Sequence, residues 1–459
     1  MARVQPLSGF PEWSPQERIL ETHVLTRLRE VFALHGFGEI ETRVVEPIAR
    51  LAGDSDAAKE IYTLGRLNAE SDADAKLGLH FDLTVPFARY IEERQGQLHF
   101  PFRRFQMQKV WRGERPQEGR YREFYQADID VVGRDSLPEH LEAEVAIVMA
   151  RALASLPIPA VRMHVNNRQL VEGFYEGVGI TDVAGALRSV DKLDKIGAAG
   201  VRAELVAKGV AERAADAVLE LAKISAPDAS FVAAVEDLWE TSWRVEDAGA
   251  LEAAQLKLAG GITSLAALVT AVNSATAFDG ADGVAVADLR IARGLDYYTG
   301  SVYETFLTGH EDLGSICSGG RYDSLVAGGG FPGVGMSIGV SRLVSRILGA
   351  GLASASRSVP SAVLVAVTDE EARPASAGIA DRLRARGIAC EVSPSAAKFG
   401  KQIQYADRRG IPFVWFPNAG EGTSADGQVK DIRNGEQMPA DADAWAPPAE
   451  DLYPSIVDG

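Results

Sequence analysis

Hydrophobic and polar side chains alternate on both sides of an arginine-rich stretch between residues 100 and 133. The alternation covers residues 105–110 and 124–131, and its period of two is typical of β-strands. A loop over 113–119 that contains Pro116 separates the two segments. The pattern predicts an antiparallel hairpin with a long charged loop.

Upstream of the hairpin, residues 15–35 have the pattern of a helix that buries one face. Ser14 is a suitable N-cap, Pro15 fits the first turn and Gly36 favours an end. The apolar residues near one face are Ile19, Val24, Leu28, Val31 and Phe32.

Two further strands are predicted before the hairpin. Residues 39–47 predict a strand closed by proline. Within 79–90, His80, Asp82 and Thr84 would share one side of a strand that Pro86 stops. A carboxylate and a hydroxyl two residues apart on one face can both reach a small cationic ligand.

After the hairpin, the pattern predicts a helix over 141–156, a strand over 160–165 and, from about residue 181 to 274, helix after helix. Strand patterns resume at 283–289 and near 302, and a strand from Val334 leads into a helix that carries Arg342. A small-residue linker follows at 352–360.

Beyond the linker, strands alternate with helices, which predicts a mostly parallel sheet. The predicted strands are 362–367, 388–392, 411–416 and 428–433, and the helices are 372–386 and 398–409. The acidic, proline-containing stretch 439–459 predicts irregular structure.

Composition narrows the class of protein. The chain has 459 residues, of which 46% are hydrophobic and 24% charged, so a multidomain globular protein is expected. The net charge of -17 argues against a general nucleic-acid coat but leaves room for a local basic face. Two cysteines, no signal-peptide pattern and no run of about 18 apolar residues predict a cytoplasmic protein without a membrane span.

Candidate chemistry gathers in the hairpin. Arginines at its rim can hold phosphate oxygens in bidentate fashion, although a solvated basic hairpin that binds nothing would have the same composition. Asp128 and Asp130 share a strand face with Gln126, which suits a metal or acid–base role, but no His or Cys cluster supports a metal site. The run GGGFPG at 328–333 matches a dinucleotide fingerprint, which we reject because it does not open a helix after a buried strand.

Five blocks of the sequence resemble one family. VWRGERP at 110–116 with GRYREFYQ at 119–126 resembles motif 2 of class II aminoacyl-tRNA synthetases, and the segments 15–47 and 333–344 resemble motifs 1 and 3. ARGLDYYTG at 292–300 with SGGRYD at 318–323 is similar to the signature of histidyl-tRNA synthetases. KFGKQIQYADRRGIP at 398–412 resembles their anticodon-binding domain.

The resemblance implies an α/β protein whose α+β catalytic core is built on an antiparallel sheet. It implies core segments at 1–180 and 281–352, a helical insertion at 181–280 and an anticodon-binding domain at 360–459. Motif 1 implies a homodimer through the segment 15–47. The partners implied are L-histidine, ATP with Mg²⁺, and tRNA(His).

Site residues follow from the same resemblance. The catalytic residues, facing the α-phosphate, are Arg112 and Arg293. Histidine would be bound by Asp82, Thr84, Gln126, Asp130, Tyr297, Tyr298 and Tyr322, and ATP by Arg112, Glu114, Arg120 and Arg342. Residues implied to bind tRNA are Gln117, Lys398, Lys401, Arg408 and Arg409. The glycines of 318–323 would let a ligand approach the backbone closely.

One alternative from another class shares this core. The histidine-binding regulatory subunit of ATP phosphoribosyltransferase resembles the synthetase but generally lacks the anticodon-binding domain and catalytic arginines. Because this chain keeps both, the sequence favours the ligase.

Overall fold

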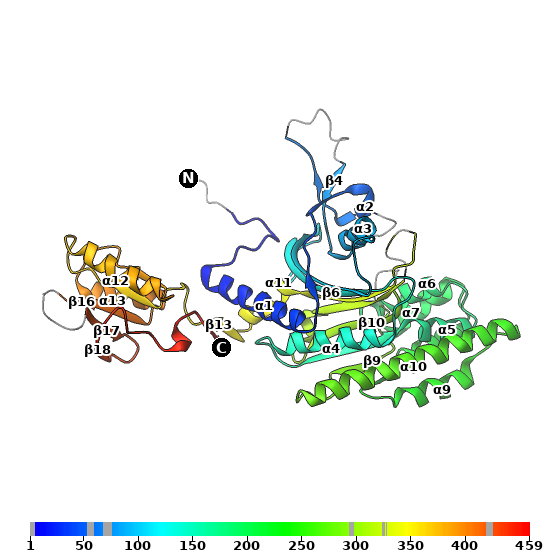
Figure 1. The fold of residues 1–459 in the computed structure, drawn as a ribbon. Coiled ribbons are helices and arrows are strands. Elements are labelled where there is room, and N and C mark those ends of the chain that lie inside the picture. The colour runs from blue at the N-terminus through cyan, green and yellow to red at the C-terminus, as the bar shows by residue number, and fades with distance from the viewer. Residues whose placement is uncertain are drawn as a thin grey trace. The chain divides into compact units, whose positions relative to one another are not determined.

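The computed structural model describes residues 5–52, 59–67, 76–292, 298–323, 326, 328–418 and 426–459. The chain divides into two compact units. The first unit is Met1–Pro11 with Val24–Arg346, and the second is Glu12–His23 with Ile347–Gly459. Figure 1 shows the helices and strands of both units.

A nine-stranded sheet forms the centre of the first unit, with the strand order β1-β5-β6-β12-β11-β10-β7-β9-β8. Only the β1–β5 and β7–β9 pairs are parallel, so the antiparallel sheet that the sequence predicts is confirmed. In sheet order, the strands are Gly38–Glu39, Phe102–Trp111, Glu123–Val132, Gly333–Gly339, Cys317–Tyr322, Tyr298–Leu307, Val161–Asn167, Ala285–Asp288 and Ser225–Ala226.

The predicted hairpin is the β5–β6 pair, whose register runs from Phe102↔Val132 to Trp111↔Glu123. Its period-two pattern separates the two faces of the sheet. Ala127, Ile129 and Val131 are fully buried. They share a face, here called the helix face, with Tyr303, whose hydroxyl donates to the Glu142 carbonyl of helix α4, His140–Ala154. The opposite face, here called the polar face, carries Gln126, Asp128 and Asp130.

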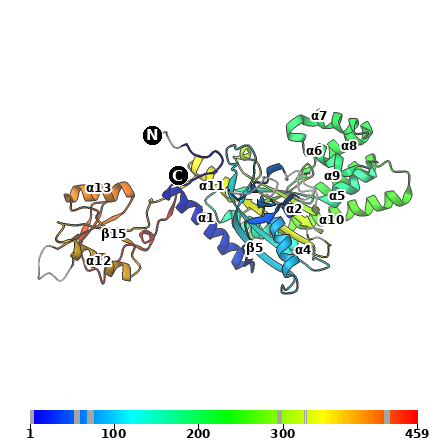
Figure 2. The same ribbon diagram turned by 90° about the horizontal axis from the view of Figure 1, so that it is seen from above.

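Helices α5, Arg168–Gly177, and α10, Ala248–Phe278, pack on each other, and α10 contacts β7 and β9. Figure 2 shows these two helices gathered with α6 to α9 on one side of the unit. The helices α6 to α9 are Val183–Val190, Leu193–Ala207, Glu212–Leu221 and Phe231–Ser242, in the stretch where the sequence predicts helices. Glycine permits the close approach of α5 to α10, because a Cβ at Gly261 would lie 2.2 Å from the Leu170 nitrogen.

Among the helices that the structure describes, α10 alone is long and apolar enough to cross a membrane by length and composition. A helix that covers a core passes the same test. Here Leu258, Leu265 and Val269 of α10 are buried within the first unit.

The region before the hairpin differs from the prediction. The expected strand over 39–47 is divided into β1 and β2, Val45–Pro47, and β2 belongs to a separate small sheet of order β2-β4-β3. In this sheet, β3 is Thr63–Leu64 and β4 is Leu77–Leu79, and the short helix α2, Ile48–Ala52, follows β2.

The predicted strand within 79–90 is wrong. Strand β4 ends at Leu79 and helix α3, Thr84–Arg94, begins five residues later. Pro86 lies in the first turn of α3, where proline is tolerated because the first helical N–H groups lack intrahelical partners. The Asp82 carboxylate accepts from the Val85 N–H at 3.1 Å and satisfies one of them.

Helix α11, Val340–Gly349, follows β12 and carries Arg342, as predicted. The 3₁₀ turn η3, Glu311–Leu313, lies between β10 and β11.

The second unit has a five-stranded sheet of order β15-β14-β16-β17-β18. The first two strand pairs are parallel and the last two are antiparallel, so the expectation of a mostly parallel sheet holds for half of the pairs. The strands β14 to β18 are Val363–Val365, Cys390–Val392, Phe413–Pro417, Gly427–Asp431 and Gln437–Ala440, and the helices α12 and α13 are Arg373–Ala385 and Phe399–Arg409. Trp415 is fully buried in the core of this unit.

The predicted linker over 352–360 contains a strand, and so does the stretch 439–459 that was expected to be irregular. Residues Ala353–Ala355 of the predicted linker form β13, which pairs antiparallel with β19, Ile456–Asp458. Strand β18 and the 3₁₀ turn η4, Ala449–Asp451, also fall in or overlap the stretch 439–459. Buried Arg357 joins the two segments, because its Nη2 donates to the carbonyls of Pro360 and Asp451 at 3.2 and 2.9 Å.

Candidate active site

A cavity of about 300 Å³ opens between the hairpin loop, β11, β12 and α11. Arg112 and Arg120 from the loop meet Arg342 from α11 in its wall, and Glu114 lies among them, 3.5 Å from Arg120 and 3.9 Å from Arg112. Backbone carbonyls orient two of the guanidinium groups. The Phe81 carbonyl accepts from Arg112 at 2.9 Å, and the Ser315 carbonyl accepts from Arg342 at 2.6 Å.

The charge balance of this cavity favours an anionic ligand. Burial lowers the pKa of Arg342, and the neighbouring charge of Arg120 lowers it further. Among the described residues that line it, one carboxylate and three guanidinium groups leave net positive charge. Phe124 in the same wall adds an aromatic surface. Arginine forks match phosphate oxygens, and an aromatic ring can stack on a planar base, so the cavity suits a nucleotide polyphosphate.

A second, smaller cavity of about 30 Å³ lies on the polar face of the sheet. Asp128, Asp130 and Thr84 line it together with Tyr298 and Tyr322. Ser318 and Ser337 belong to the walls of both cavities. A ligand in the small cavity would therefore adjoin one in the large cavity.

Buried carboxylates dominate the small cavity. Burial raises the pKa of Asp130 to about 7, against the opposing charge of Arg104, and burial raises the pKa of Asp82 to about 6. Burial also raises the pKa of Asp128. Arg104 is fully buried, with Nη2 2.6 Å from Asp130 Oδ2, and the Tyr322 hydroxyl donates to Asp130 Oδ1 at 2.8 Å. With three buried carboxylates near one buried guanidinium, this cavity favours a cationic ligand.

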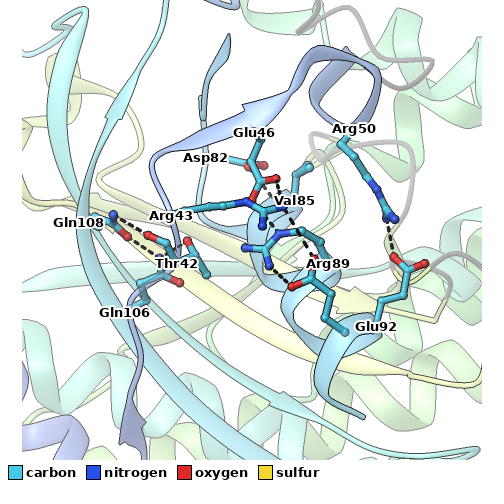
Figure 3. Close-up of polar contacts among 11 residues, drawn as sticks. Thr42, Arg43, Glu46, Arg50, Asp82, Val85, Arg89, Glu92, Gln106 and Gln108 are labelled. Carbon is cyan, nitrogen blue, oxygen red and sulfur yellow. Dashed lines mark hydrogen bonds and ion pairs between the residues drawn. The ribbon is translucent and has the colours of Figure 1, made fainter. Parts of the chain in front are cut away.

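Asp82 is held in place by helix α3, which a buried ion pair fixes (Figure 3). Arg89 of α3 donates to Glu46 of β2 at 2.7 Å, and both side chains are buried. Arg43 contacts the other Glu46 oxygen at 3.0 Å. The segment before β2 is tied to the hairpin, because the Gln106 amide donates to the Thr42 hydroxyl at 2.9 Å. These contacts connect the start of α3 to strand β5.

The glycines of the sheet make room for the protein's own side chains as well as for the cavity. Gly319 of the segment 318–323 lines the small cavity, and a Cβ at Gly320 would lie 2.7 Å from the Tyr298 ring. Likewise, a Cβ at Gly335 would lie 2.0 Å from Asp130 Oδ1. The absent side chains therefore make room for the protein's own ring and carboxylate, which in turn form the cavity wall.

The structure brings most of the predicted site residues together. Arg112, Glu114, Arg120, Arg342 and Gln126 line the large cavity, and Thr84, Asp130, Tyr298 and Tyr322 line the small one, with Asp82 beside them. Arg293 and Tyr297 lie outside the described residues. Gln117 is exposed in the hairpin loop and lines neither cavity.

The predicted tRNA-binding residues of the second unit lie on or beside α13. Lys398, Lys401 and Arg408 are exposed. Arg409 is instead paired with Glu391 at 3.1 Å and stacks on Tyr405, so it is less available to a ligand.

Sequence reasoning missed Arg104 and underestimated Asp128. Arg104 was one of several arginines in a basic run, and only the register Arg104↔Asp130 marks it as the buried partner of a site carboxylate. The family resemblance gives Asp128 a structural role and no ligand, but Asp128 lines the small cavity. Within the described residues, no group of three or more His, Cys, Asp or Glu side chains is arranged to hold a metal ion.

The raised pKa of Asp130 predicts a pH-dependent stability. Between its ordinary pKa of 3.8 and about 7, the folded protein holds a proton that the unfolded chain has released. The free energy of unfolding without ligand should therefore fall as the pH rises through this window, by roughly 2 kcal/mol from about pH 5 to pH 7. Asp130→Asn should remove this part of the pH dependence, which denaturant titrations of both proteins would measure.

The matched control for this prediction is Asp237→Asn, an exposed position on α9. It should follow the wild-type pH profile. The assignment would be contradicted if the difference in unfolding free energy between Asp130→Asn and wild type stayed constant across this pH window.

Comparisons with known proteins agree with this geometry. A family model described as histidyl-tRNA synthetase matches residues 9–343, and an anticodon binding domain model matches 361–444. The histidine–tRNA ligase of Cutibacterium acnes is 53% identical, with 100% of this chain and 99% of that protein covered. The Micrococcus luteus ligase is 54% identical, with the same coverage.

A solved structure extends the likeness to three dimensions. The crystal structure of histidyl-tRNA synthetase from Nostoc sp. PCC 7120 is similar with a TM-score of 0.82 and 34% identity, and the match covers 96% of this chain and 98% of that one. The likeness thus spans both units and both cavities, and the chain belongs to the histidyl-tRNA synthetase family.

Proposed function

We propose that the protein is a histidine–tRNA ligase that activates L-histidine with ATP and transfers it to the 3′ end of tRNA(His). The observation that carries the proposal is the adjacency of the two cavities. One is lined by arginines and the other by buried carboxylates, and they share Ser318 and Ser337. Joining a cationic amino acid to a nucleotide requires such a pair of sites. The full-length relatives that carry the name histidine–tRNA ligase support the same assignment.

In the activation step, a carboxylate oxygen of histidine attacks the α-phosphorus of ATP. A new O–P bond forms, the bond to the β-phosphate oxygen breaks, and pyrophosphate leaves. The protein's contribution is to position the reactants and to place positive charge where charge builds up on the phosphate. We assign this role to Arg112 in the large cavity and to Arg293, with Glu114, Arg120 and Arg342 holding the rest of the nucleotide.

Histidine would occupy the small cavity and extend into the adjoining large cavity, because about 30 Å³ alone is too small for an amino acid. We assign its ammonium group to Asp82, Thr84 and Gln126, and its imidazole to Asp130 with Tyr322. Tyr298 forms a wall of the cavity, and we place Tyr297 near it on the resemblance alone. Bringing a cation beside Asp130 would lower the pKa of that carboxyl, because an opposite charge favours the ionised form.

We propose that magnesium reaches the site with ATP, held by phosphate oxygens and water. Mg²⁺ usually keeps several waters and often binds with substrate phosphates. This arrangement needs no cage of protein ligands.

The histidine-binding regulatory subunit of ATP phosphoribosyltransferase is the second candidate. A solved protein from Bacillus halodurans described as such a regulatory subunit/histidyl-tRNA synthetase has a TM-score of 0.67 but only 19% identity, which shows a shared fold alone. The arginines of the large cavity and the match to an anticodon binding domain favour the ligase.

The first prediction from this proposal concerns Arg112. Wild-type protein should exchange labelled pyrophosphate into ATP only when histidine is present, and Arg112→Ala should slow this exchange by roughly two to three orders of magnitude, the effect of removing one preorganised donor. Arg115→Ala, an exposed arginine of the same loop that lines neither cavity, is the matched control and should stay within about twofold of wild type. Exchange that another amino acid supports equally well would overturn the ligase assignment.

We further propose that the protein is a homodimer through the segment 15–47. Closed twofold symmetry is the commonest arrangement of soluble oligomers. Light scattering of an active preparation at micromolar concentration should give about twice the chain mass of 49.1 kDa. A monomeric mass in that preparation would exclude this proposal.

A third prediction from this proposal concerns tRNA binding by the second unit. Lys398 and Lys401 are exposed at the start of α13, in a chain that is otherwise acidic. If they contact phosphates, the double variant Lys398→Ala/Lys401→Ala should weaken tRNA binding and reduce the slope of log affinity against log salt by about one to two, because fewer counterions are released. Pyrophosphate exchange should be unchanged.

The matched control removes the same charge from the other helix of that unit. Arg373→Ala/Arg384→Ala on α12 should leave tRNA affinity within about twofold. Equal losses in the two double variants would mean that net charge matters and that α13 is not a specific contact.

A further inference from the structure

A row of polar side chains crosses the polar face of the nine-stranded sheet and continues beyond both cavities. The strand register places Asp128 beside Ser337, Ser337 beside Ser318, Ser318 beside Glu304 and Glu304 beside His164. Residues directly opposite each other on neighbouring strands share a face. Since strands lie about 4.8 Å apart, His164 on β7 is about 10 Å from Ser318 in the shared cavity wall.

His164 is oriented by a buried carboxylate at the end of β9. Its Nδ1 lies 2.8 Å from Asp288 Oδ2, and the Asp288 side chain is only 6% exposed. The edge of the His164 ring meets Phe306 with 5.2 Å between the centroids. Because Nδ1 is engaged by Asp288, Nε2 is the ring atom that can meet a ligand.

Hydrogen bonds fix the backbone around this pair. The Asn166 amide donates to the carbonyls of Leu289 and Ile291 at 3.3 and 2.7 Å, which fixes the chain after Asp288 to strand β7. Arg290, 43% exposed in its side chain, lies 3.5 Å from Asp288 and 3.3 Å from Asp194 of α7, so a positive charge stands near the carboxylate that orients the histidine. Neither His164 nor Asp288 has a role in the activation step above.

We propose that His164, oriented by Asp288, binds the 3′-terminal nucleotide of tRNA during the transfer step. This inference rests on the proposed function. His164 Nε2 would hydrogen-bond a hydroxyl of the terminal ribose, and Arg290 would contact the phosphate of that nucleotide. A single-stranded end that enters from the β7–β9 side of the sheet would reach the adenylate along the row Glu304–Ser318.

The chemical step itself does not pass through His164. A hydroxyl oxygen of the terminal ribose attacks the carbonyl carbon of the histidyl-adenylate. The new ester bond forms, the bond from that carbon to the phosphate oxygen breaks, AMP leaves, and the hydroxyl proton passes to solvent. His164 therefore acts by positioning the nucleotide that brings this hydroxyl.

A ribose is present in both substrates, so the test must separate ATP from tRNA. Histidine-dependent pyrophosphate exchange reports on ATP without tRNA. Single-turnover transfer from enzyme-bound histidyl-adenylate to tRNA(His) reports on the tRNA. In full-length protein, His164→Ala should leave exchange within about threefold and slow transfer by about 10- to 100-fold, the range when removal of one hydrogen-bond partner leaves the other unsatisfied.

A second measurement locates the contact on the tRNA. Affinity is compared for intact tRNA(His) and for tRNA(His) that ends one nucleotide earlier. His164→Ala should weaken binding of the intact tRNA and leave binding of the shortened tRNA equal to that of wild type. His99→Ala, an exposed histidine in the loop between α3 and β5, is the matched control and should change none of these quantities.

Three results would overturn the inference. The first is that exchange falls as far as transfer, which would indicate that His164 contacts the ribose of ATP or supports the sheet. The second is that transfer stays within twofold of wild type. The third is that His164→Ala weakens binding of intact and shortened tRNA equally. If His164→Ala does not fold, His164→Asn retains a polar partner for Asp288 with a shorter reach and should give the same selective loss. Absence of exchange in the wild-type protein would refute the ligase function separately.

Discussion

The site depends on the burial of three carboxylates around one guanidinium group. Asp82, Asp128 and Asp130 are each more than nine-tenths buried, and Arg104, fully buried beneath them, lies over the Phe87 ring at 4.2 Å. Among the described residues, none gives an Arg104 side-chain nitrogen a hydrogen bond of good geometry, so its compensation there is the ion pair with Asp130. Burial of unbalanced charge is costly, and it raises the pKa of each of these acids. A cationic ligand would supply the missing charge, so the same imbalance that costs stability provides affinity.

Much of the first unit can be understood as support for that arrangement. The hairpin places Arg104 opposite Asp130, the pair Arg89–Glu46 fixes the helix that starts beside Asp82, and Tyr322 donates to Asp130 from β11. Strand alternation keeps the polar and apolar side chains of β6 on opposite faces, because a shift of one residue would move Asp128 and Asp130 into the helix layer. The buried apolar residues Ala127, Ile129 and Val131 hold the register of the strand that bears Gln126, Asp128 and Asp130.

Local patterns in the sequence were sufficient for the hairpin, for helix α1, Pro15–Leu34, and for the strand and helix that present Arg342. They failed at Thr84–Arg94, where a helix begins with proline in its first turn and takes a capping carboxylate from Asp82, so the apparent period of two was accidental. They also failed at β13 and β19, which are about a hundred residues apart in sequence, because only tertiary pairing makes these short segments strands. Arg104 could not be chosen among its neighbours without the register, since composition does not distinguish a buried arginine from an exposed one.

The proposed selection of histidine follows from which groups in the small cavity would be left unpaired by another amino acid. Asp130 has its two oxygens committed to Tyr322 and Arg104, and its pKa near 7 is close to the ordinary value of about 6.5 for imidazole. An imidazole can therefore share a proton with this carboxyl at little cost. An aliphatic side chain of similar volume would add no partner for the remaining lone pairs of Asp130, and such a loss typically discriminates more strongly than a difference in shape. On this proposal, selectivity comes from polar groups that are already buried before the substrate arrives, and the unliganded protein is less stable because of their burial.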